Sequence, residues 1–195
     1  MRYLAVLLFI SAIASAQSHR MPSMQTSTGG RAICSKCEAP ANIAASITLA
    51  QQGEPGEPME ISGTVYERDG RTPAAGVVLF VYHTDATGHY DPEDDPFAPR
   101  LRGWMRTGSD GHYRFRSVRP APYPNHSEPA HIHVHIWSDT MPEHFLPEYW
   151  FADDPLIKPA DAAHFRDLDS FSPIVKLTRG SDGVWRGVRD IRLDR

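Results

Sequence analysis

Short runs of alternating or continuous apolar residues follow one another along most of the chain after residue 60. Residues 113–118 and 131–137 alternate with a period of two, the period of a β-strand with two different faces. Residues 76–83 form a Val-rich apolar run that is too short for a typical helix, which predicts a buried strand. Further strands are predicted at 61–66, 174–177 and 184–193. The fold class predicted is all-β: an antiparallel β-sandwich with long loops.

The segments outside these strands predict the domain organisation. Two long loops, 91–100 and 119–129, are rich in Pro and polar residues, and loops on a rigid sandwich often carry binding sites. Residues 17–59 have the composition of an irregular N-terminal leader, with one short helix expected near 41–50. The sandwich domain itself is expected to span 60–195.

The first residues carry the pattern of a secretory signal. Arg2 precedes an apolar run over 4–13, and Ala-Ser-Ala at 14–16 offers small residues for cleavage. The run is too short to span a bilayer as a helix, which disfavours a membrane anchor. We therefore expect residues 1–16 to be a signal peptide, and the mature protein to be secreted or periplasmic and not membrane-bound.

Composition and cysteine usage narrow the picture. The chain has 195 residues, 41% of them hydrophobic and 23% charged, which is ordinary for a soluble globular protein. A net charge of -4 disfavours a nucleic-acid partner, because phosphate binding needs concentrated Lys and Arg. Cys34 and Cys37 are spaced C-x-x-C in the leader, and in an oxidising compartment we expect them to form a local disulfide.

The most informative segment is 131–137, His-Ile-His-Val-His-Ile-Trp. On a strand its three histidines, His131, His133 and His135, point to one face and the aliphatic residues to the other. A solvated polar face is the plainer interpretation, but Ser, Thr or Lys would serve it equally well. Imidazoles two residues apart can bind one transition-metal ion. Tyr123, held between two prolines shortly before this strand, adds an anionic oxygen donor suited to a ferric ion.

Two motifs give the sequence its resemblance to a known family. They are Pro-Ala-Pro-Tyr-Pro at 120–124 and Pro-Ala-His-Ile-His at 129–133. With them the chain resembles the intradiol ring-cleavage dioxygenases, which include protocatechuate and catechol dioxygenases. Further segments match in the same order, at 63–65, 73–77, 85–90, 107, 110–115 and 151–156. The leader with its two cysteines resembles that of an exported bacterial subgroup.

The resemblance implies a mononuclear ferric ion, Fe(3+), held in a β-sandwich by two tyrosines and two histidines. It implies that a catechol-type aromatic diol and O2 are the substrates and that the ring opens between the hydroxylated carbons to a muconate-type diacid. Carried over to this sequence, Tyr123, His131 and His133 are three of the four metal ligands and the catalytic residues.

The fourth ligand does not carry over directly. The family's other tyrosine is expected in the loop after the Gly-x-Tyr turn, where counting from Tyr90 leads to Phe97, which cannot bind a metal. Tyr90 matches the turn tyrosine, for which the resemblance implies a structural role. His135, Tyr90, His89 or a water are therefore the alternatives for the fourth position.

Two acidic residues depart from the family pattern and bear on the substrate. Glu128 stands where the family commonly has arginine, and Glu148 stands where it has glutamine near the site. Carboxylates at these places would oppose a negatively charged substrate. Two functions therefore remain open: an iron(III) intradiol dioxygenase, and a non-catalytic metal- or ligand-binding sandwich module that has lost the fourth ligand. Either is compatible with an oligomer.

The signal-peptide assignment predicts that exported protein begins at Gln17. N-terminal sequencing of protein recovered outside the cytoplasm should lack residues 1–16, because the small residues at 14–16 present the cleavage site. Exported protein that still begins at Met1 would contradict the assignment.

Overall fold

The computed structural model describes residues 35–36, 38–91, 95–96 and 98–194. All of them belong to one compact unit, 33–195. The predicted signal peptide, both cysteines and Phe97 lie outside the described residues.

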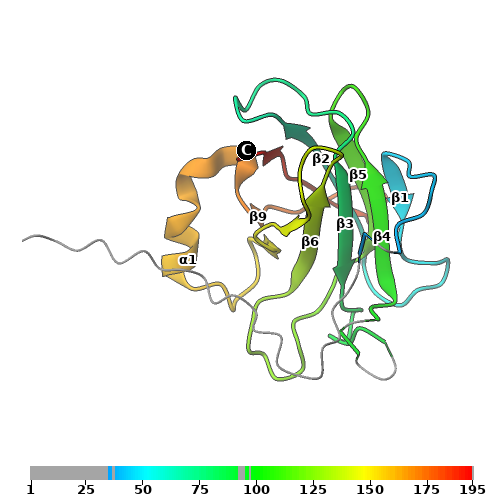
Figure 1. The fold of residues 1–195 in the computed structure, drawn as a ribbon. Coiled ribbons are helices and arrows are strands. Elements are labelled where there is room, and N and C mark those ends of the chain that lie inside the picture. Colours follow the sequence, from blue (N-terminus) through cyan, green and yellow to red (C-terminus); the bar gives the residue numbers. More distant parts are fainter. Residues whose placement is uncertain (1–34, 37, 92–94, 97, 195) are drawn as a thin grey trace, which may run out of the picture. The chain divides into compact units, whose positions relative to one another are not determined.

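Two β-sheets make up the fold (Figure 1). The first sheet has the order β1 (Ser46–Thr48), β5 (His112–Val118), β2 (Pro58–Tyr66), β11 (Trp185–Val188) and β10 (Thr178–Arg179), with β12 (Ile191–Arg192) also paired to β2. The second has the order β4 (Leu101–Arg106), β3 (Val78–His83), β6 (His131–Trp137), β8 (Tyr149–Phe151) and β9 (Ile174–Val175), with β7 (His144–Phe145) paired to β6. A short helix, α1 (Pro159–His164), and a 3-10 helix, η1 (Arg166–Phe171), lie between β8 and β9 in the chain.

The predicted β-sandwich is confirmed, and its sheets are mixed. The central pairs β2–β5, β3–β4 and β3–β6 are antiparallel, as expected. Parallel pairings occur where β1, β11 and β12 join the first sheet and where β9 joins the second. Within the described part of the chain, no helix has the length and apolar composition needed to span a bilayer.

The helix expected near 41–50 was wrong, because this segment bonds to strand edges instead. Its residues 46–48 form β1, which pairs in parallel with β5. Just before it, the carbonyl of Ala44 accepts the backbone N–H of Arg106 on β4, and that of Ala45 accepts the N–H of Arg114 on β5. The segment thereby satisfies backbone donors on both sheets, which a helix could not do.

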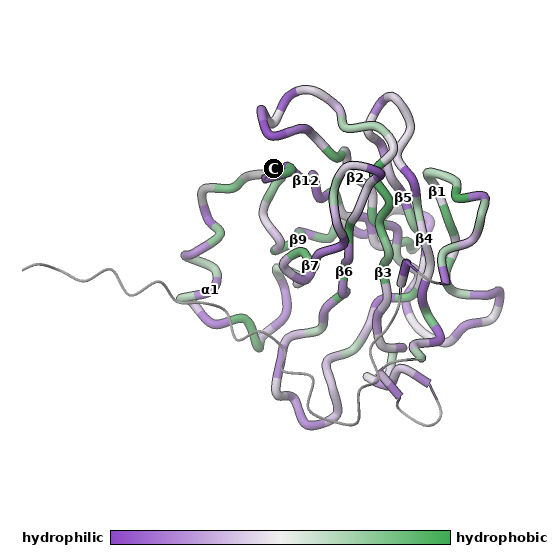
Figure 2. Tube along the Cα trace, in the orientation of Figure 1, coloured by the Kyte–Doolittle hydropathy of each residue, from purple (hydrophilic) through white to green (hydrophobic). Residues whose placement is uncertain are grey.

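The core lies between the two sheets and is built from their inward-facing residues. Figure 2 shows hydrophobic stretches in the central strands and hydrophilic colouring in many of the connecting loops. The strands β2 and β5 alternate buried and exposed residues, as the sequence pattern predicts. The buried side chains that fill the core include Ile61, Val65, Leu79, Val81, Tyr113, Phe115, Ile132, Val134, Ile136 and Phe151.

Strand β6 is buried on both faces, and this positions the candidate site. All seven of its residues are buried, the three histidines included. Its aliphatic residues enter the core, as predicted. Its histidine face contributes to a second, largely aromatic cluster on the outer face of the sheet. That cluster contains Val78, Phe80, Tyr82, Tyr90 and Trp137, with Ala39, Ile43, Trp104 and Tyr123 packed against it.

Candidate metal centre

Four side chains bring their donor atoms together on the outer face of β6. The Nε2 atoms of His131 and His133 are 3.1 Å apart, and the hydroxyl of Tyr123 lies 3.2 Å from the first and 3.4 Å from the second. The hydroxyl of Tyr90 lies 2.5 Å from that of Tyr123 and 2.9 Å from Nε2 of His133. We call these four side chains the donor cluster.

The two tyrosines come from two loops that are bonded to each other. Tyr90 follows β3, and Tyr123 follows β5. The loops are joined where the N–H of Ala121 donates to the carbonyl of Asp85 over 3.0 Å and the hydroxyl of Thr84 donates to the carbonyl of Ala121 over 2.8 Å. These bonds set the distance at which the two phenol rings approach β6.

A glycine lets the two loops come this close. Gly88 adopts a φ of +88°, a conformation that glycine accepts without steric cost. A Cβ at this position would overlap the carbonyl oxygen of Pro122, in the other loop. The approach of the loops therefore depends on the absent side chain as well as on the positive φ.

The partners of the two ring Nδ1 atoms determine how the histidines present Nε2. Nδ1 of His131 lies 2.7 Å from the carbonyl oxygen of Pro129, and Nδ1 of His133 lies 2.9 Å from a carboxylate oxygen of Glu148. Both partners accept hydrogen bonds, so each neutral imidazole carries its proton on Nδ1. The Nε2 lone pairs of both rings then face the same small space.

These distances and donor types fit a bound metal ion. Nitrogen and oxygen ligands at bond lengths of about 2.0–2.2 Å are about 3 Å apart when they sit at right angles on one ion. The donor–donor distances of 2.5–3.4 Å match such a set. Two imidazoles and two phenol oxygens form a hard, potentially dianionic donor set that suits ferric iron.

Burial makes this cluster unfavourable for charge unless a cation is present. Burial, followed by the nearby Tyr123, raises the pKa of the Tyr90 hydroxyl well above its usual value. Burial, followed by the charge of His133, lowers the pKa of His131, which keeps this imidazole neutral and able to bind metal. A bound cation reverses the cost for the phenols, because metal coordination favours their ionised form.

Glu148 is charged in spite of its surroundings. Burial raises the pKa of this carboxyl group, but the hydrogen bond from His133, together with the positive charge that His131 and His133 carry when protonated, lowers it to about 2. An oxygen of Glu148 and the ring nitrogens of His131 and His133 lie within 4.8 Å of one another. Because Glu148 contacts Nδ1 of His133, it lies behind this ring, on the side opposite Nε2.

The alternatives for the fourth donor are placed differently. Tyr90, one of these alternatives, joins the cluster, although the resemblance implied a structural role for it. His135 contacts Glu143 over 2.7 Å and Ser35 over 3.2 Å through Nδ1. His89 is part of a turn in which its carbonyl and N–H are both bonded to Asp85.

Sequence reasoning missed the contact between Glu148 and His133. The contact follows from the strand register: Ile132 pairs with Tyr149, and this brings the preceding residue, Glu148, beside His133. This register is set by β8, a strand of three residues, Tyr149–Phe151, that the apolar pattern did not predict.

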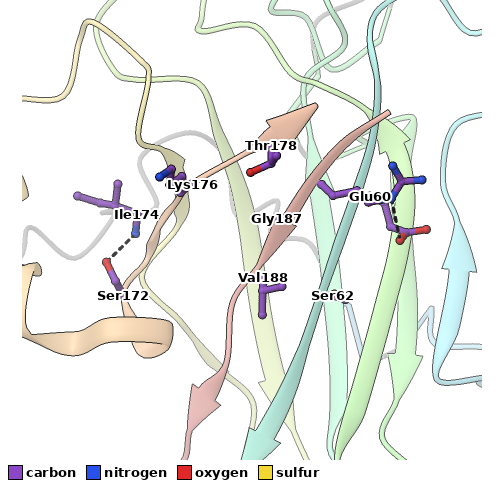
Figure 3. Close-up of a pocket in the computed structure, with 9 residues that line it drawn as sticks. Glu60, Ser62, Ser172, Ile174, Lys176, Thr178, Gly187 and Val188 are labelled. Atoms are coloured by element: carbon purple, nitrogen blue, oxygen red, sulfur yellow. Dashed lines mark hydrogen bonds and ion pairs between the residues drawn. The ribbon is translucent and has the colours of Figure 1, made fainter. Parts of the chain in front are cut away.

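A second concave region lies away from the donor cluster. A groove of about 400 Å³ lies between β2, β10, β11 and the segment before β10, and Figure 3 shows residues that line it. Part of its polar lining is engaged within the protein: Glu60 pairs with Arg116 and Arg186, and Ser172 accepts the N–H of Ile174. The candidate chemistry therefore belongs to the donor cluster.

The fold and the donor cluster define a class: β-sandwich proteins with a site of two histidines and two tyrosines. A family model described as a dioxygenase matches residues 36–173, well over half of the chain. The chain belongs to the intradiol dioxygenase family.

Two curated relatives illustrate the similarity. The chain is 32% identical over 119 residues to a protocatechuate 3,4-dioxygenase beta chain of Burkholderia cepacia, covering 55% of this chain and 50% of the relative. It is 32% identical over 119 residues to a catechol 1,2-dioxygenase of Acinetobacter lwoffii, covering 51% of this chain and 38% of the relative. The matches thus span half or less of the length of these relatives.

Solved structures agree on the fold. The dioxygenase domain of a dioxygenase carbohydrate-binding protein fusion from Streptomyces sp. SirexAA-E is 27% identical, with a TM-score of 0.59 over 80% of this chain and 94% of that one. A chlorocatechol 1,2-dioxygenase from Pseudomonas putida is 23% identical, with a TM-score of 0.59 over 81% of this chain and 68% of that one, and shows the fold alone.

Substituting one donor at a time should show which residues bind the metal and which are only neighbours of the site. We expect His131→Ala and His133→Ala to abolish ferric binding. We expect Tyr123→Phe and Tyr90→Phe to shift or remove the visible tyrosinate–iron band. Each change deletes one of four donors. Iron analysis and absorption spectra of purified variants provide the measurement.

Two controls accompany these variants. His135→Ala should leave iron content unchanged, and Tyr113→Phe should leave the band unchanged, because the Tyr113 hydroxyl bonds to Tyr149 and to the carbonyl of Arg189 in the core. Loss of iron in His135→Ala, with iron retained in Tyr90→Phe, would contradict the assignment of Tyr90.

The contact between the tyrosine loops gives a second prediction. Gly88→Ala should weaken ferric binding by about tenfold or more, as changes around metal ligands typically do, because the methyl group pushes the loop of Tyr123 away from that of Tyr90. Gly53→Ala is the matched control, since Gly53 has the same φ of +88° but a Cβ there would meet nothing within 4 Å. Titration with ferric ion that finds equal affinities in the two variants would contradict the role of this contact.

Proposed function

We propose that this protein is an iron(III) intradiol dioxygenase that cleaves a catechol-type aromatic diol, with O2 as co-substrate, to a muconate-type diacid. The observation that carries the proposal is the convergence of two phenol oxygens and two imidazole nitrogens within 2.5–3.4 Å of their neighbours. Family membership supports the same reaction, which the names of the relatives give for those proteins.

The residues of the chain divide the work as follows. Tyr123, His131, His133 and Tyr90 would hold the ion, and ferric iron would supply the Lewis acidity that binds the diol oxygens and makes the ring reactive toward O2. Tyr82 stacks on the His133 ring at a centroid distance of 4.5 Å and an interplanar angle of 20°, which fixes the plane of that imidazole. Tyr123 is only partly buried, so a substrate would approach the cluster from its side.

The non-catalytic sandwich module is the weaker candidate. It was favoured by the apparent loss of the fourth ligand, and the Tyr90 hydroxyl, 2.9 Å from Nε2 of His133, weighs against such a loss. Export, which we also propose, rests on the sequence of residues 1–16.

Charge around the cluster favours an uncharged ring. Glu148 lies behind His133, and Glu128 is exposed just before the histidine strand. Arg100, Arg102 and Arg119 are each ion-paired with a carboxylate. The carboxylates of Glu148 and Glu128 would both repel the negative charge of a carboxylated catechol, Glu128 less strongly because solvent screens it.

Oxygen consumption by the iron-loaded protein tests the proposal. We expect O2 uptake with unsubstituted catechol and slower uptake with a carboxylated catechol such as protocatechuate. Diacid formation should match the O2 consumed, because both oxygen atoms enter the ring-opened product. Iron-loaded protein that shows the visible band but consumes no O2 with any catechol would favour the non-catalytic module.

A further inference from the structure

We propose that Glu148 tunes the metal centre by charge, acting through His133 to stabilise the ferric state. This inference rests on the proposed function, because it requires that His133 binds iron. It concerns a residue that departs from the glutamine which the resemblance implies at this position.

The contact joins a buried imidazole to a partly buried carboxylate. Glu148 precedes β8, and the register of β8 against β6 places it beside His133. One carboxylate oxygen lies 2.9 Å from Nδ1, and the two side chains are 29% and 7% exposed, respectively. Because Tyr82 stacks on the same imidazole, the ring is held from its face as well as from its Nδ1 edge.

A carboxylate at this place changes what His133 offers to the metal. A hydrogen bond from Nδ1 to an anion increases the basicity of Nε2, which strengthens it as a ligand. Glutamine could accept the same hydrogen bond through its amide oxygen, but without the charge. The difference between Glu and Gln here is therefore mainly one negative charge.

The charge count shows why this matters. Two phenolates and the Glu148 carboxylate supply three negative charges, which equal the three positive charges of ferric iron. In a poorly solvated site such a balance favours Fe(3+) over Fe(2+), since the reduced ion would leave one negative charge uncompensated. With glutamine at position 148, the ferric site would keep one positive charge.

The chain contains a matched reference for this contact. A carboxylate oxygen of Glu143 lies 2.7 Å from Nδ1 of His135, and the side chains of Glu143 and His135 are 27% and 3% exposed. His135 lies on the same face of β6 as His133. His135 contributes nothing to the donor cluster. Replacing Glu143 therefore makes the same chemical change at a similar carboxylate–histidine contact without altering a proposed ligand.

The experiment compares Glu148→Gln and Glu143→Gln with the wild-type protein, all loaded with iron. Three readouts apply: the position of the tyrosinate–iron band, the Fe(3+)/Fe(2+) potential, and ferric affinity by competition with a chelator. For Glu148→Gln we expect the band at longer wavelength, a higher potential, and ferric affinity lower by about tenfold or more. For Glu143→Gln we expect wild-type values in all three.

The outcomes separate the two proposals. A wild-type protein that binds iron without a visible band would overturn both the proposed iron site and the role of Glu148. A wild-type band that Glu148→Gln leaves in place, with an unchanged potential, would overturn only the role of Glu148, as would equal shifts in both variants. If Glu148→Gln does not fold, Glu148→Asp carries the test: it keeps the charge, so its potential should stay near the wild-type value, and a clear rise would count against charge tuning.

Discussion

Two imidazole lone pairs directed at the same space are the constraint on which the site depends. The carbonyl of Pro129 and the carboxylate of Glu148 each accept a hydrogen bond from Nδ1, so in the neutral rings Nε2 of His131 and Nε2 of His133, 3.1 Å apart, each direct a lone pair at the same space. Two acceptors at this distance need hydrogen-bond donors or a cation, and the neutral hydroxyls of Tyr90 and Tyr123 lie within donating distance of them. Both tyrosine hydroxyls approach the same space, and on ionisation they too would require a cation.

Burial turns this constraint into a site with fixed geometry. The sheet supplies the inner half of the packing, through Ile132 and Val134, while an aromatic layer covers the outer face. On that side Tyr82 fixes the plane of the His133 ring. Close packing leaves little freedom to change donor distances, which is how a site can be preorganised for an ion of one size. The loops complete the arrangement, since hydrogen bonds of Thr84 and Asp85 to Ala121 join the loop that carries Tyr90 to the loop that carries Tyr123.

Much of this could be predicted from the sequence, for identifiable reasons. Alternation over 131–137 is a local signal, and it correctly assigned the strand and its two faces. Tyr90 was only one of four alternatives for the fourth donor, beside His135, His89 and a water, because position in the chain does not show where a loop residue lies in space. Its hydroxyl reaches the histidines only because two loops far apart in sequence are bonded together. Residues 46–48 of the leader form β1 where a helix was expected, for the same reason: the strand edge that β1 pairs with, on β5, is distant in the sequence.

The comparison between His133 and His135 shows which part of the molecule defines the site. Both histidines are buried on one face of one strand, and each donates through Nδ1 to a glutamate. Nε2 of His135 finds no hydrogen-bond partner among the described residues, whereas Nε2 of His133 has two phenol oxygens and a second imidazole within reach. The strand thus carries the same histidine–glutamate contact twice, but only the contact of His133 adjoins the donor cluster. What distinguishes the two positions is the pair of tyrosine loops, so the proposed metal site depends on loop geometry, while the strand supplies rigidly held imidazoles.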